Sequence, residues 1–153
     1  MLYVCPECGL ARFESHGDTV RCLSCGKTIR YNERKEFECD GEFPFRYVAD
    51  WYDYQEDFVN RLDLSSYIEK PMFEDTVKIS EVIVYKHKKL IADGVKCSLY
   101  GDRVTVDIDG SPLEMTFDDI KAAACLGRNK LNIYHGNRIY QIVGGRRFNA
   151  LKY

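Results

Sequence analysis

The stretch Cys5-Pro6-Glu7-Cys8-Gly9 recurs in outline as Cys22-Leu23-Ser24-Cys25-Gly26, so two C-x-x-C-G units occupy the first 26 residues. Two residues between the cysteines of each unit allow a tight turn that aims both sulfurs at one ion. Four thiolates at tetrahedral corners are a ligand set that zinc prefers in structural sites. The glycine after each pair can adopt a backbone conformation in which a side chain would collide. The pattern predicts one structural zinc ion, bound by Cys5, Cys8, Cys22 and Cys25.

A single C-x-x-C pair has other interpretations, which include a redox dithiol and a c-type haem site. Two pairs with 13 residues between them favour a metal, and reduced or disulfide-bonded cysteines are the alternative. His16 is not needed as a ligand because four thiolates complete the site, so we expect it at a hairpin tip. We expect the other three cysteines to be buried small apolar side chains: Cys39, Cys97 and Cys125. This cysteine usage indicates a reducing compartment, and therefore a cytoplasmic protein.

Residues 1–35 form the predicted zinc ribbon. Residues 10–21 indicate a β-hairpin with its turn at 16–18, and residues 28–31 indicate a third strand. Three short strands bury too little apolar surface for independent stability, so we expect the metal to supply much of the folding free energy.

Residues 36–75 form a predicted acidic linker that contains one helix. Its net charge is −9, and its aromatic residues are expected to pack on a neighbouring element. The predicted helix spans residues 50–62, with Asp50 as its N-cap. The apolar side chains of one helical face are expected to dock onto the next domain rather than to form a ligand site. That face contains Trp51, Gln55, Phe58, Val59 and Leu62.

In residues 76–153 the spacing of apolar residues changes from the helical period of 3.6 to the period of two that is typical of strands. The segments that show it are 77–80, 82–85, 90–91, 95–99, 104–108, 113–117, 120–125, 132–134 and 138–143. Turn signals such as Asp93-Gly94 separate them. Short strands with tight turns predict a small antiparallel barrel or sandwich, and residues 146–153 predict a brief C-terminal helix. The fold class is therefore mainly β (α+β).

About seven strands at this spacing, closed by a C-terminal helix, resemble the PH-like superfold, including its GRAM-type and bacterial PH members. The resemblance covers residues 77–153. Split-barrel and OB-like folds are the alternatives.

No catalytic set is evident in the sequence. The three histidines, His16, His87 and His135, have no nucleophile or orienting partner near them in the chain. There is no G-x-S-x-G, no phosphate-binding glycine loop and no H-E-x-x-H. We therefore expect no active site in this chain.

The layout of the whole chain resembles the accessory region that follows the catalytic domain in some bacterial 1-acyl-glycerol-3-phosphate acyltransferases. These enzymes transfer an acyl chain to lysophosphatidic acid during phospholipid synthesis. The resemblance is carried by the two cysteine units, by Asp50-Trp51-Tyr52 at the helix start, and by the strand-rich end. The family's catalytic motif, His followed five positions later by Asp, does not occur here. The resemblance thus implies a non-catalytic piece of such an enzyme, or a stand-alone relative.

Residues 76–153 carry a net charge of +5, which suggests contact with an anionic lipid surface. The candidate residues are Lys86, Lys88, Lys89, Arg128, Lys130, Arg138, Arg146 and Arg147. A solvated face that pairs with the acidic segment is the alternative. The resemblance adds a catalytic acyltransferase domain as a partner. With no apolar run of 18 to 20 residues, any membrane contact is expected to be peripheral.

Nucleic acid is the disfavoured partner. Residues 1–35 carry a net charge of only +2 and precede the acidic segment, which would repel phosphate. The ribbon also lacks aromatic residues interleaved with basic ones. A stand-alone zinc-ribbon protein that binds nucleic acid or a protein partner is the alternative function.

Overall fold

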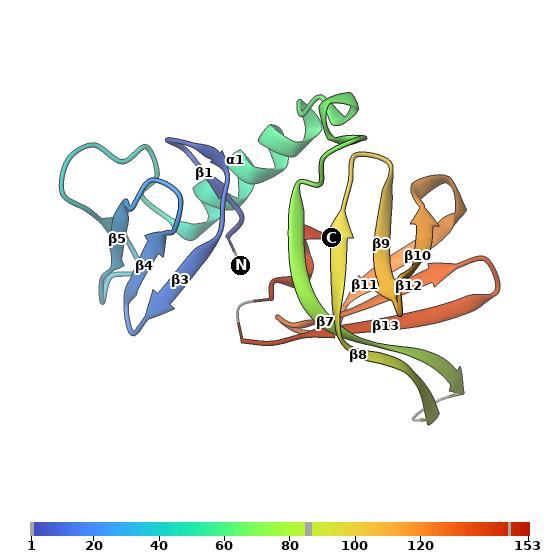
Figure 1. The fold of residues 1–153 in the computed structure, drawn as a ribbon. Coiled ribbons are helices and arrows are strands. Elements are labelled where there is room, and N and C mark those ends of the chain that lie inside the picture. Colours follow the sequence, from blue (N-terminus) through green and yellow to red (C-terminus); the bar gives the residue numbers. More distant parts are fainter. Residues whose placement is uncertain (1, 85–86, 147) are drawn as a thin grey trace. The chain divides into compact units, whose positions relative to one another are not determined.

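The computed structural model describes residues 2–84, 87–146 and 148–153, and the chain forms two compact units, residues 2–62 and 63–153. The first contains small sheets and one α-helix, and the second a curled antiparallel sheet (Figure 1). The fold is mainly β, as predicted. The boundary divides the acidic segment 36–75, because residues up to Leu62 belong to the first unit. Two predicted anion contacts, Lys86 and Arg147, lie outside the described residues.

The first unit contains six short strands. The strand β1 (Val4–Cys5) pairs with β2 (Gly9–Leu10). A four-stranded antiparallel sheet follows, made of β3 (Phe13–His16), β4 (Thr19–Cys22), β5 (Thr28–Tyr31) and β6 (Phe37–Glu38). The predicted hairpin and third strand are confirmed. The fourth strand was predicted as linker, but its residues pair with β5.

The helix α1 spans Val48–Asn60, two residues earlier than the predicted 50–62. Asp50 is the third helical residue rather than the N-cap, which is Tyr47. The Asp50 carboxylate accepts hydrogen bonds from the backbone N–H groups of Tyr47 (2.8 Å) and Arg46 (3.2 Å). A carboxylate in the first turn also stabilises the positive end of the helix dipole, so Asp50 stabilises the helix start from inside the helix.

The buried residues of α1 pack within their own unit, although we expected this face to dock onto the next domain. Trp51 is fully buried, whereas Val59 is 38% exposed. Ring centroids 5.1 to 5.8 Å from that of Trp51 belong to Phe13, Phe37, Phe43 and Phe45. The aromatic residues of the acidic segment thus complete the core that the ribbon strands are too short to form.

The second unit contains one seven-stranded antiparallel sheet. Its strands are β7 (Phe73–Val84), β8 (His87–Leu99), β9 (Arg103–Ile108), β10 (Ser111–Thr116), β11 (Ile120–Cys125), β12 (Lys130–His135) and β13 (Arg138–Gly144). Short 3-10 turns at Leu64–Tyr67 and Phe117–Asp119 precede β7 and β11. The spatial order is β10-β9-β8-β7-β13-β12-β11. Two meanders are therefore joined by pairing of β7 with β13, and the sheet curls into a half-barrel (Figure 1).

The expected turn at Asp93-Gly94 lies inside β8, and the short predicted segments merge into the two long strands β7 and β8. The register changes from Val77↔Val95 to Ile79↔Ala92, so residues 93–94 form a bulge. Gly94 has a φ of +71°, a conformation that glycine adopts without strain. The local glycine signal was correct, but its consequence is a bulge rather than a chain reversal.

The expected C-terminal helix is only a 3-10 turn, Ala150–Lys152. Phe148 is buried against Gly144, where an added Cβ would lie 2.1 Å from the Phe148 side chain. Lys152 Nζ lies 3.1 Å from Asp75 Oδ2, and these side chains are only 3% and 9% exposed. The hydroxyl of Tyr153 donates to the same oxygen (3.0 Å), so the chain end is bound to β7.

Candidate metal centre

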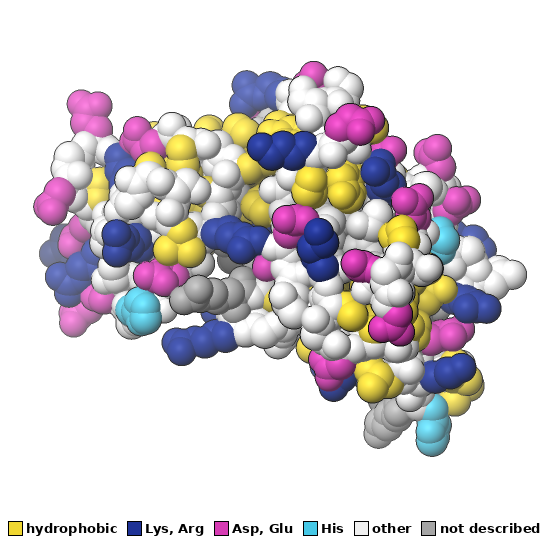
Figure 2. Space-filling model, viewed as in Figure 1, with side chains coloured by type: hydrophobic (Ala, Val, Ile, Leu, Met, Phe, Trp, Pro, Cys, Tyr) yellow, Lys and Arg dark blue, Asp and Glu magenta, His cyan; other side chains and the backbone are white. Residues whose placement is uncertain are grey.

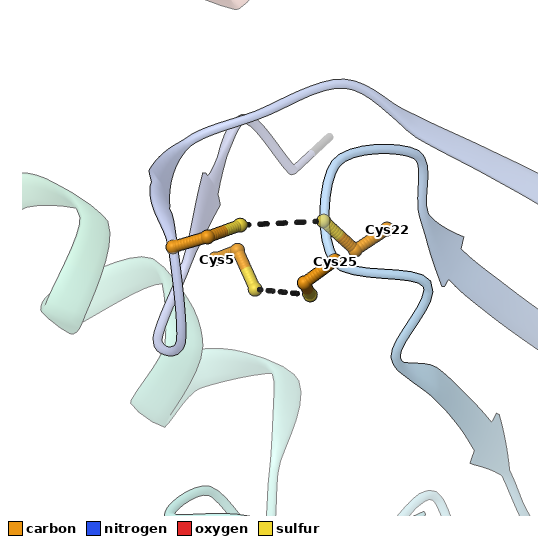
Figure 3. A group of neighbouring side chains, drawn as sticks. Cys5, Cys22 and Cys25 are labelled. Carbon is orange, nitrogen blue, oxygen red and sulfur yellow. Dashed lines mark hydrogen bonds between the residues drawn. The ribbon is translucent and has the colours of Figure 1, made fainter.

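The four predicted ligands come from two loops. Cys5 and Cys8 lie at the β1–β2 turn, and Cys22 and Cys25 at the end of β4 and in the loop before β5. All four Sγ atoms lie within 4.8 Å of one another. Each loop faces the other, with Sγ distances of 3.7 Å for Cys5–Cys25 and 3.7 Å for Cys8–Cys22 (Figure 3). The prediction that these cysteines form one group is confirmed.

These distances suit a metal ion bound by four thiolates. A tetrahedron with metal–sulfur bonds of about 2.3 Å has sulfur–sulfur edges of about 3.8 Å. A disulfide needs a sulfur–sulfur distance of about 2.0 Å, and the four cysteines are free thiols. The group can therefore hold one metal ion with little movement of the sulfurs.

The two loops form equivalent halves of the site. The first cysteine of each pair, Cys5 or Cys22, is fully buried, whereas the second is exposed. The Cys5 sulfur accepts hydrogen bonds from the backbone N–H groups of Glu7 and Cys8, and Cys22 accepts them from Ser24 and Cys25. Such donors stabilise a thiolate. Gly9 and Gly26, with φ of +75° and +80°, turn the chain after each half.

The pKa values of the thiols reflect this environment. Partial loss of water around the sulfur atom raises the pKa of Cys5 and of Cys8, and hydrogen bonds with the neighbouring thiols raise that of Cys8 further. Burial also opposes ionisation of Cys22, but the hydrogen bonds that its sulfur accepts outweigh this effect and lower its pKa. We therefore expect the thiols of Cys5 and Cys8 to be protonated without metal, so that metal binding releases protons from them.

Side chains of helix α1 bind the backbone of Val4, the residue that precedes Cys5. Gln55 Oε1 accepts hydrogen bonds from the backbone N–H groups of Tyr3 (2.7 Å) and Val4 (3.1 Å). Trp51 Nε1 donates to the Val4 carbonyl oxygen (2.8 Å). Both backbone polar groups of Val4 are thus satisfied by side chains of α1. The sequence placed Trp51 and Gln55 on a buried face but did not link them to the metal group. The available signal was a glutamine on an apolar face, since a buried amide needs partners.

Gln55→Met is expected to lower zinc affinity about tenfold or more, the usual effect of losing a group that orients a metal ligand. The substitution leaves two backbone N–H groups next to Cys5 without an acceptor. Competition with a chromophoric chelator measures the affinity. Glu56→Met places the same side chain on the exposed side of the helix and should leave the affinity unchanged. Equal affinities for the two variants would contradict this role of Gln55.

The other three cysteines differ from one another. Cys97 is buried as predicted, and burial together with the neighbouring Asp75 raises its pKa to about 12. Cys39 is partly exposed, and its thiol donates to the Gly41 carbonyl oxygen (3.4 Å). Cys125 is exposed, so the prediction of burial was wrong for this residue. It lies on β11, an edge strand of the sheet.

Alkylation of the zinc-loaded chain at pH 8 is expected to label Cys39 and Cys125 quickly and Cys97 very slowly. A buried thiol with a pKa near 12 supplies almost no thiolate at that pH. Addition of a chelator should expose the four metal ligands, and denaturation should then expose Cys97. Peptide mass spectrometry measures the labelling at each position. Labelling of Cys97 at the rate of Cys125 would show that the sheet core is open.

The predicted anion-contacting residues are spread over several elements. Lys88 and Lys89 lie in β8, Lys130 in β12 and Arg138 in β13. Arg138 lies 3.6 Å from Glu81, and Lys88 Nζ donates to Gln141 Oε1 (2.6 Å). Arg128 and Arg146 are exposed.

Within the described residues, the group that could hold a metal ion contains the four cysteines and none of the histidines. His16 is the exposed last residue of β3, at the hairpin tip as predicted. His87 begins β8, and the ring of His135 lies 6.4 Å from that of Tyr140.

Comparison of the chain with family models, curated proteins and solved structures gives no match. In the parts of the chain that the structure describes, no helix has the length and apolar character needed to cross a bilayer.

Proposed function

We propose that this chain is a non-catalytic, zinc-binding accessory domain that directs a phospholipid-synthesis acyltransferase to its membrane or to a partner. One observation carries the proposal: Trp51 and Gln55 of α1 form hydrogen bonds with β1, the strand that contains the first cysteine of the group. The cysteine units and the Asp50-Trp51-Tyr52 helix start are the features that resemble the acyltransferase accessory region. These features are 25 positions apart in the chain, from Cys25 to Asp50, but pack in one core, which supports treating them as one unit, as the resemblance requires.

Zinc is the metal that this ligand set favours. A tetrahedral set of four thiolates suits zinc or an iron–sulfur centre, and one ion held by four cysteines leaves no open position for a substrate. The role proposed for the metal is therefore structural. It is supported by the small core of the first unit, which would gain stability from such an ion.

The seven-stranded half-barrel supports the binding part of the proposal. Its strand number is that expected from the resemblance to the PH-like superfold, and four of the eight basic candidates lie in its strands: Lys88, Lys89, Lys130 and Arg138. In this proposal the sheet unit binds the membrane or a partner. The acyl transfer itself is carried out by a separate catalytic domain of the acyltransferase.

The size of the native product tests the proposal. An antibody raised against this chain is applied to lysate from the source organism, and the detected band is identified by peptide mass spectrometry. We expect a band more than twice the 17.8 kDa of this chain, with peptides from an acyltransferase domain that contains the His, four residues, Asp motif. A single band at 17.8 kDa would contradict the acyltransferase assignment.

A further inference from the structure

The strands β7 and β8 extend beyond their neighbours in the sheet. Strand β13 pairs with β7 only up to Glu81, and β9 pairs with β8 only from Cys97 to Leu99. The end of the β7–β8 hairpin therefore projects from the half-barrel (Figure 1). We call residues 82–84 and 87–92, the described part of this projection, the arm.

The arm exposes apolar side chains to an unusual degree. Among the described large hydrophobic residues, the three most exposed are Val84 (58%), Ile83 (57%) and Leu90 (54%). All three belong to the arm, although isolated exposed hydrophobic residues are common on protein surfaces. A concentration of them at the end of a projecting hairpin indicates a contact surface.

The charge of the arm is entirely positive. Residues 82–84 and 87–92 contain two lysines, Lys88 and Lys89, and no Asp or Glu. Lys89 is exposed, and His87 and Lys88 precede it in β8. Hydrophobic, basic and histidine side chains lie together on the projection (Figure 2). The nearest acidic residue on the paired strand, Glu81, is engaged with Arg138.

We propose that the arm inserts into the interface of an anionic lipid bilayer, an inference that rests on the membrane-directing role proposed above. A bilayer interface accepts apolar side chains below the headgroups and lysines at the level of the phosphates. Three residues of strand span about 10 Å. This length matches the depth of about 5 to 10 Å at which interfacial segments penetrate. Nucleic acid would bind the lysines but would leave the apolar side chains exposed.

Co-sedimentation of the zinc-loaded, 153-residue chain with vesicles tests the inference. One set contains phosphatidylcholine alone, and the other contains phosphatidylcholine with phosphatidylglycerol. We expect binding to the second set that weakens as salt is added, because ions screen the lysines. Absence of binding, or equal binding to both sets, would overturn the inference.

Matched variants locate the contact. The triple variant Ile83→Thr, Val84→Thr, Leu90→Thr keeps residues that tolerate strands and should weaken vesicle binding about tenfold or more. Leu90→Thr alone should weaken binding more than Leu126→Thr, a control at a residue that is 48% exposed outside the arm. Lys89→Gln should weaken binding about fivefold, whereas Lys121→Gln, an exposed lysine of β11, should not.

Unchanged zinc content and melting temperature confirm that each variant folds. If the arm variants bind vesicles as tightly as their controls, the arm is not the contact. If they instead convert a dimer into a monomer in light scattering, the arm binds a second copy, and the inference is overturned. The immunoblot distinguishes the two proposals, because vesicle binding by a 17.8 kDa native product would refute only the acyltransferase assignment.

Discussion

Cys22→Ala is expected to release the zinc and to unfold residues 2–62. Structural zinc contributes about 10 to 16 kcal/mol in small zinc domains, which is comparable to the whole stability of an ordinary domain, about 5 to 15 kcal/mol. Cys22 is fully buried, and the hydrogen bonds that its sulfur accepts lower its pKa. Its loss leaves three thiols and removes the link between the two loops.

The first unit has little apolar core to compensate for the lost metal. The buried cluster beneath the site consists of Cys5, Ala11 and Cys22, with Phe13 packed against it. Two of these residues, Cys5 and Cys22, are themselves candidate metal ligands. Apolar burial elsewhere depends on Trp51, whose position depends on Val4 beside the site.

Zinc content and two-dimensional NMR spectra measure the effect of Cys22→Ala. Signals of the first unit should lose their dispersion, and signals of the sheet unit should keep theirs. Cys125→Ala is the matched control, because it removes an exposed cysteine outside the metal group. Full zinc retention by Cys22→Ala would count strongly against the site.

Asp75→Asn is expected to destabilise the sheet unit by about 3 to 5 kcal/mol, the usual cost of leaving a buried charge without its partner. Lys152 Nζ lies 3.1 Å from the Asp75 carboxylate and 4.7 Å from the centroid of the Phe73 ring. Its side chain is only 3% exposed, so water cannot replace the lost carboxylate without movement of the chain end. Chemical denaturation monitored by circular dichroism measures the change in unfolding free energy.

Glu74→Gln is the matched control for the charge pair. Glu74 is the neighbouring residue on β7 and lies 3.3 Å from Lys96, but these side chains are 47% and 62% exposed. Exposed pairs contribute about 0 to 1 kcal/mol, so this variant should remain nearly as stable as the parent. Addition of Lys152→Met to Asp75→Asn should recover part of the loss by removing the buried positive charge. Equal stability of Asp75→Asn and Glu74→Gln would contradict a buried, unscreened pair.

The features that the sequence predicted best depend on local spacing. The turn within each C-x-x-C-G unit requires only neighbouring residues. The alternation of apolar and polar residues along the chain predicts most strands of the sheet. The error at Asp93-Gly94 also has a local origin, since glycine at a positive φ serves bulges and turns equally. Only the pairing partner on β7 decides between the two.

The features that the sequence could not predict depend on contacts between distant residues. The capture of Val4 by Gln55 joins residues 51 positions apart, and the Asp75–Lys152 pair joins residues 77 positions apart. The exposure of the arm could not be predicted from the sequence for a different reason. Ile83, Val84 and Leu90 follow the same apolar pattern as core strands, and only the shorter neighbouring strands leave them exposed.

Native mass spectrometry of the purified chain, combined with cobalt substitution, tests the central claim that one zinc ion holds the first unit together. We predict one zinc per chain, lost on acidification as the thiolates are protonated, and a cobalt form with the visible absorption of a tetrahedral tetrathiolate. A chain that is folded without any metal, or that contains disulfides among Cys5, Cys8, Cys22 and Cys25, would contradict the account.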